Sequence, residues 1–111
     1  MAVVKIGEKV TEENLKKARE EYGDFIKIVA DIVTGAMAIG GEWHADAEKT
    51  LLDSGSRQDD IWGGSIDLAS NQIDTIALIN IRPRLDNNSQ EILDPKIREK
   101  FVVIVKKKFS L

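Results

Sequence analysis

The chain has 111 residues, of which 42% are hydrophobic and 32% charged, which predicts one small domain with a single core. Its net charge of −3 argues against nucleic-acid binding, which needs a basic surface. The absence of cysteine excludes disulfides and thiolate metal sites.

The first half of the chain alternates helix and strand signals. Periodicity and turn residues predict strands at residues 3–6, 25–33 and 36–39 and helices at residues 11–22 and 44–53. Thr11 is the predicted N-cap of the first helix. The two strands that flank Thr34 and Gly35 form a predicted hairpin, and both are apolar on both faces. We therefore expect this hairpin at the centre of the sheet, covered on each side.

The second half predicts two more strands and a helix. The strands are expected at residues 61–68, with a bulge at Gly63 and Gly64, and at residues 75–81, after a turn at residues 70–72. A polar loop follows to residue 93, and Asp94 then caps a helix that begins with Pro95.

These elements occur in the order β-α-β-β-α-β-β-α, which predicts a single α+β domain over residues 1–111, with a mostly antiparallel sheet and about three helices. In the last helix, Val102 and Val103 fall off the main apolar stripe. If they are exposed, the C-terminal helix is a surface for a homo-oligomer.

The only histidine lies in an acidic segment. On a helix His44 and Glu48 share a face and Asp46 points elsewhere, whereas on a strand all three share one face. Either geometry presents an imidazole and a carboxylate to a divalent metal, the one cofactor that the sequence suggests. There is no second histidine and no HExxH or EF-hand spacing, so a structural histidine is the competing interpretation.

A second candidate site surrounds Arg82, at the end of the strand predicted to stop at Pro83. Arg84 flanks Pro83 on its other side, and together the two arginines suit an anion such as phosphate or carboxylate. Further polar groups come from Asn80, Asn87, Asn88 and Ser89. The alternative, which we prefer, is that Arg82 pairs with Asp46 or Glu48.

The two tryptophans, Trp43 and Trp62, are expected to anchor the core near the second helix. The alternative, stacking of a tryptophan such as Trp62 on a base or sugar, is disfavoured because the surrounding charge is acidic. No GxSxG, P-loop or dinucleotide-binding motif occurs, and no nucleophile is predicted beside the histidine.

Several of these residues fall in motifs that resemble a family of small prokaryotic domains of unknown function. The motifs are ExHADxE (42–48), LLxxGSxQ (51–58), IWG (61–63), INIRP (79–83), NxS (87–89) and DPxIR (94–98). Asn88 departs from the arginine expected there, which argues against a basic site in that loop. The resemblance implies no activity.

The first ten residues are too short and too charged for a signal peptide, and no apolar run approaches the roughly 20 residues that span a membrane. We therefore expect a cytoplasmic protein without membrane contact. The leading function hypothesis is a non-catalytic interaction or structural module, and the alternative is a metal-dependent or anion-binding site, enzymatic or not, around His44 and Arg82.

Overall fold

A computed structural model describes residues 3–111, so the first two positions of the domain predicted over residues 1–111 lie outside the described part. The elements are β1 (Val4–Ile6), α1 (Glu12–Tyr22), β2 (Phe25–Asp31), β3 (Met37–Ile39), α2 (His44–Asp53), η1 (Gln58–Asp60), β4 (Ile61–Asp67), β5 (Gln72–Asp74), η2 (Leu78–Asn80), η3 (Pro83–Leu85) and α3 (Pro95–Lys108). The η elements are short 3₁₀ helices. The predicted α+β class and the order of its strands and α-helices are confirmed.

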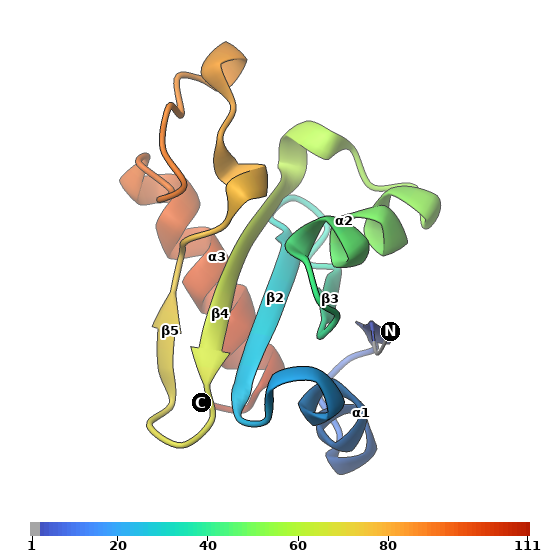
Figure 1. Cartoon of the computed structure of the whole chain (residues 1–111). Helices are drawn as coiled ribbons and strands as arrows, with labels where there is room; N and C mark the ends of the chain where they lie inside the picture. Colours follow the sequence, from blue (N-terminus) through green and yellow to red (C-terminus); the bar gives the residue numbers. More distant parts are fainter. Residues whose placement is uncertain (1–2) are drawn as a thin grey trace.

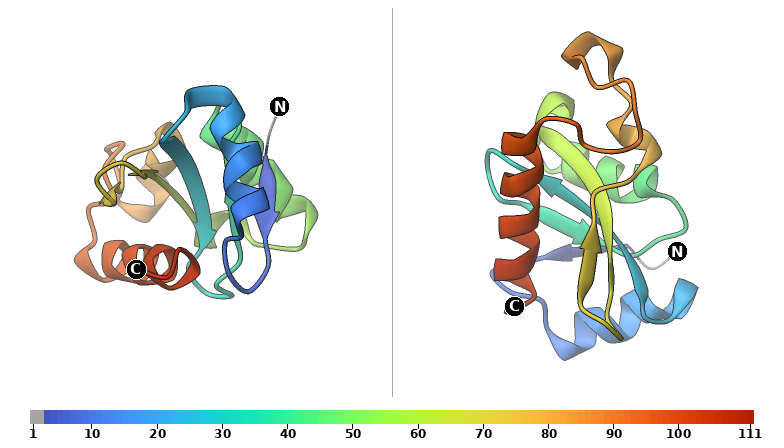
Figure 2. Two further views of the ribbon diagram at one scale, coloured as in Figure 1. Left: turned by 90° about the horizontal axis from the view of Figure 1, so that it is seen from below. Right: turned by 90° about the vertical axis from the view of Figure 1, so that its left-hand side faces the viewer.

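The five strands form one antiparallel sheet in the order β1-β3-β2-β4-β5 (Figure 1). The hairpin of β2 and β3 lies inside the sheet, as its apolar faces predicted. Both faces are covered, because α3 packs along one and α2 lies on the other (Figure 2). Successive residues of β2 show this division: Ile28 packs in the core cluster of α3, and Val29 packs in that of α2.

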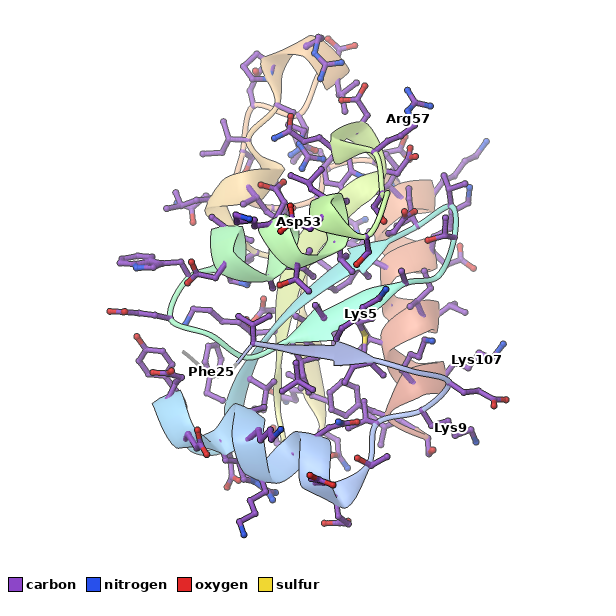
Figure 3. The ribbon with its side chains drawn as sticks, turned by 90° about the vertical axis from the view of Figure 1, so that its right-hand side faces the viewer. Lys5, Lys9, Phe25, Asp53, Arg57 and Lys107 are labelled. Atoms are coloured by element: carbon purple, nitrogen blue, oxygen red, sulfur yellow. The ribbon has the colours of Figure 1, made fainter. Side chains whose placement is uncertain are left out.

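The helix starts follow their local sequence. Thr11 caps α1 by accepting a hydrogen bond from the backbone of Asn14, and the Asn14 side chain accepts one from the backbone of Thr11. Asp94 accepts from the backbone of Lys96, with Pro95 at the first helical position of α3. Charged side chains such as those of Lys5, Asp53 and Lys107 are exposed (Figure 3).

The predicted bulge at Gly63 and Gly64 is wrong, because β4 pairs with β2 in unbroken register through both glycines. They are needed for close packing instead. A Cβ built on Gly64 lies 2.2 Å from the Asp74 carbonyl oxygen, and one built on Gly63 lies 2.8 Å from the Cβ of Ala77.

The strand predicted at residues 75–81 is also wrong. The strand at this edge, β5, is only three residues long and occupies residues 72–74, and η2 follows it after a short extended stretch. A side chain takes the place of the missing strand, since Asn80 both accepts from the backbone N–H of Gly63 (2.8 Å) and donates to its carbonyl (2.9 Å).

The C-terminal helix differs in part from expectation. Val102 is half-buried and packs against the core, whereas Val103 is 55% exposed, so only Val103 meets the condition set for a partner surface. Within residues 3–111 no helix has both the length and the apolar character needed to cross a membrane.

Candidate functional site

Two cavities, one apolar and one polar, lie between α2 and the segment that carries η2 and η3, and Ile79 lines both. The apolar cavity, of about 160 Å³, is lined by Trp43, His44, Ala45, Leu78 and Ile79. The polar cavity, of about 320 Å³, is lined by Glu48, Gln58, Ile79, Ile81, Arg82 and Arg84. We call these two cavities together the α2–η2 groove.

Two buried asparagines hold the outer wall of the groove in place. Asn80 is fully buried and, besides its two bonds to Gly63, donates to the carbonyls of Thr75 and Gln90. Asn87 donates to the carbonyl of Asn80, and its backbone forms an antiparallel bridge with Arg82. The wall is therefore fixed largely by side-chain amides, while Leu78 and Ile79 of η2 line the apolar cavity together with residues at the start of α2.

His44 begins α2 and lies against β4. Its Nε2 is 2.7 Å from the carbonyl oxygen of Gly64, and because a carbonyl only accepts, Nε2 carries the proton and donates. Burial lowers the pKa of His44, the bond to Gly64 raises it, and the positive charge of Lys27 lowers it again; the net shift is downward from 6.5. The imidazole is therefore neutral at pH 7, with Nδ1 as a hydrogen-bond acceptor.

The polar cavity is built around a buried ion pair. Nη2 of Arg82 donates to Glu48 at 3.1 Å, and the two side chains are only 8% and 12% exposed. The guanidinium carbon lies 4.9 Å from the centre of the Trp62 ring, within cation–π range. Burial lowers the pKa of Arg82, and the charge of Glu48 opposes that shift. Nη1 of Arg82 and Nε1 of Trp62 are buried donors without a partner among the described residues.

A second ion pair lies at the rim of the polar cavity. Arg84 donates from both terminal nitrogens to the two carboxylate oxygens of Asp59, and its side chain is 65% exposed. This bidentate contact lowers the pKa of Asp59.

The comparison with protein families matches residues 4–108 to the family described as "Protein of unknown function (DUF5674)". The chain belongs to this family. No curated protein and no solved structure matches it.

The structure brings some of the sequence candidates together. His44, Glu48 and Arg82 line the groove, with Trp62 packed beneath the guanidinium. The predicted pairing of Arg82 with one of two acids is present, and the partner is Glu48. The remaining candidates form hydrogen bonds within the protein. Asn80 and Asn87 are examples, because their side chains bond to the backbone.

Asp46 and Ser89 also make backbone contacts away from the groove lining. Asp46 accepts from the backbone of Trp43 at 3.2 Å, and Ser89 accepts from the backbone of Glu91 at 3.1 Å. No group of three or more His, Cys, Asp or Glu side chains within residues 3–111 is arranged to hold a metal ion. The three ligands suggested by sequence, His44, Asp46 and Glu48, each contact a different partner.

Sequence reasoning missed the apolar half of the groove. Trp43 was expected in the core, yet it is 59% exposed, whereas Trp62 is buried as predicted. Leu78, which is 60% exposed, and Ile79 were assigned to a strand. Gln58 and Arg84 also line the polar cavity, and Arg84 was one of the two arginines beside Pro83 that suggested an anion site.

Proposed function

We propose that this protein is a non-catalytic binding module that receives an apolar group of a partner in the α2–η2 groove. The observation that carries the proposal is the exposure of Trp43 (59%) and Leu78 (60%), two large apolar side chains that line the same cavity. Isolated exposed apolar residues are ordinary, but apolar side chains gathered around a cavity mark interaction sites.

The composition of the groove supports binding. Its apolar end contains a tryptophan, a residue type that often dominates the energy of protein interfaces. The polar cavity beside it carries the exposed ion pair of Arg84 with Asp59, and polar contacts next to an apolar patch are common at interfaces.

The contacts of the titratable groups favour binding over catalysis. His44 has a backbone carbonyl as its hydrogen-bond partner, and Glu48 is engaged by Arg82, so neither is paired with a nucleophile.

An NMR titration with toluene tests the proposal. Toluene should shift the resonances of His44, Ala45 and Ile79, which line the apolar cavity, and Trp43→Ala should weaken this binding severalfold. Val103→Ala is the matched control, because Val103 is comparably exposed (55%) but lies on α3. Shifts scattered over the surface, or equal binding by all three proteins, would overturn the proposal.

Anion binding in the polar cavity is a second candidate, favoured by the buried Nη1 of Arg82, which has no acceptor within residues 3–111. Arg84 at the rim adds an exposed guanidinium. Phosphate or acetate should then shift the guanidinium resonances of Arg82, and Arg84→Ala should weaken the effect. Unchanged Arg82 resonances at high millimolar anion would exclude this candidate.

Self-association through α3 is a third candidate, supported by the exposure of Val103. Light scattering should then give a dimer that Val103→Lys dissociates. A monomer at high micromolar concentration would exclude it.

A further inference from the structure

We infer that the apolar cavity selects an aromatic ring that carries one hydrogen-bond donor, the tyrosine side chain of a partner polypeptide, and that its hydroxyl donates to Nδ1 of His44. This inference rests on the proposed binding function and names the chemistry of the group that is bound.

The orientation of the His44 ring carries the inference. Nε2 is bonded to the carbonyl of Gly64 at 2.7 Å, and Cδ2 faces Gly63, since a Cβ built on that glycine lies 3.2 Å from it. Nε2 and Cδ2 form one edge of the imidazole, so that edge lies against β4. Nδ1 lies across the ring from this edge, away from the sheet, in a side chain that lines the apolar cavity.

The protonation state makes Nδ1 an acceptor. With the proton on Nε2 and the pKa of His44 lowered by burial, the imidazole is neutral at pH 7. A neutral imidazole with Nε2–H has one lone pair, on Nδ1, and can only accept there. Among the side chains that line the cavity, only that of His44 offers a hydrogen-bond acceptor, which matches a ligand group with an apolar body and one donor.

The volume matches a single aromatic ring. The cavity measures about 160 Å³, and an apolar cavity of about 150 Å³ is known to hold benzene. Trp43 offers an aromatic face and Leu78 an aliphatic wall, and both favour a ring over a small aliphatic group. A serine would leave the volume unfilled, a carboxylate would meet the lone pair of Nδ1, and a lysine would lose its hydration. Tyrosine avoids all three costs.

A polypeptide is the source to which we commit, because a second, polar cavity lies next to the apolar one, with Ile79 lining both. Gln58 and Arg84 there provide polar groups for the main chain beside the tyrosine. A free phenolic compound would leave that half of the groove unused.

The test compares three ligands by NMR titration: the N-acetyl amides of tyrosine, phenylalanine and O-methyltyrosine. One net hydrogen bond corresponds to about a three- to ten-fold difference in affinity, so tyrosine should bind that much more tightly than the other two. His44→Phe keeps an aromatic ring at this position and removes the acceptor Nδ1, so the variant, once its amide spectrum shows that it is folded, should bind the tyrosine and phenylalanine amides equally.

Each outcome decides a different point. Equal affinity of the native protein for the three amides would overturn the hydrogen bond to His44. It would still support the groove as a binding site. Failure of toluene and all three amides to bind would overturn the groove itself. Binding of free phenol without the tyrosine amide would overturn the polypeptide source. The ¹⁵N spectrum of the His44 ring gives a check that needs no variant: a protonated Nδ1 would overturn the inference.

Discussion

The guanidinium of Arg82 donates to the carboxylate of Glu48 at 3.1 Å, and this contact joins the segment after β5 to α2. The two residues come from opposite sides of the groove, 34 positions apart in the chain. Because both side chains are almost wholly buried, each charge depends on the other for compensation.

Removing one partner should therefore lower the stability of the fold substantially. Arg82→Ala leaves the carboxylate of Glu48 buried and unpaired, and we expect a loss of about 3–5 kcal/mol in the free energy of unfolding. Urea denaturation in ligand-free buffer measures it. Arg84→Ala is the control, since it breaks an exposed pair that should contribute less than about 1 kcal/mol.

Replacing both partners with apolar residues separates the contribution of the ion pair to stability from the contribution of side-chain packing. The double variant Arg82→Met with Glu48→Leu should recover most of the lost stability, because a buried ion pair is often no more stabilising than apolar groups of similar size. A loss below about 1 kcal/mol for Arg82→Ala alone would show that the pair is not structural and would favour the anion site.

Asn80 should be as important to the sheet edge as the ion pair is to the groove. Asn80→Ala removes the partners of both backbone groups of Gly63, and we expect a loss of about 2–4 kcal/mol, with faster hydrogen exchange at the Gly63 amide. Asn88→Ala, an exposed change in the same segment, should stay within about 0.5 kcal/mol. Equal stability of the two variants would contradict the role given to Asn80.

The fold was predictable where its signals are local. Thr11 and Asp94 cap their helices with partners two or three residues away, so their neighbourhood in the sequence determines the result. The strand predicted at residues 75–81 failed for the opposite reason. The edge of β4 is satisfied by the side chain of Asn80, 17 residues from Gly63, and no local pattern distinguishes that arrangement from a strand.

The candidate site was predictable by charge and not by shape. Opposite charges predicted that Arg82 pairs with Asp46 or Glu48, and Arg82 forms an ion pair with Glu48. Whether a tryptophan is buried depends on the elements that cover it. Trp43 and Trp62 therefore give the same signal in the sequence, although their exposures are 59% and 1%.

Gly64→Ala should show how tightly the sheet packs against α3. The added methyl group lies 2.2 Å from the carbonyl oxygen of Asp74 and 2.7 Å from the ring of Phe101, so β5 or α3 must shift. We expect a loss of at least about 1–3 kcal/mol by urea unfolding. Gly7→Ala is the matched control, because a Cβ there meets nothing within 4 Å. Similar losses of stability for the two variants would show that the sheet shifts to make room for the methyl group at position 64.

The protonation of His44 should make stability fall in mild acid. Burial lowers its pKa in the folded protein below 6.5, the ordinary value expected for the unfolded chain. Above pH 6.5 both states are neutral, and this contribution to stability is fully present. Below that pH the unfolded chain takes up a proton that the folded protein resists, so stability is lost until pH passes the folded pKa, with a slope of at most about 1.4 kcal/mol per pH unit.

Urea unfolding from pH 7.5 to pH 5 measures this dependence, and His44→Gln isolates it. The variant keeps Lys27 and Asp74, the charged groups that act on the ring, as well as Asp31 and Asp59, whose lowered pKa values also weaken the fold in acid. Its stability should therefore fall less steeply than that of the native protein. Parallel curves would mean that His44 titrates alike in both states, and the neutral acceptor assigned to Nδ1 would lose its basis.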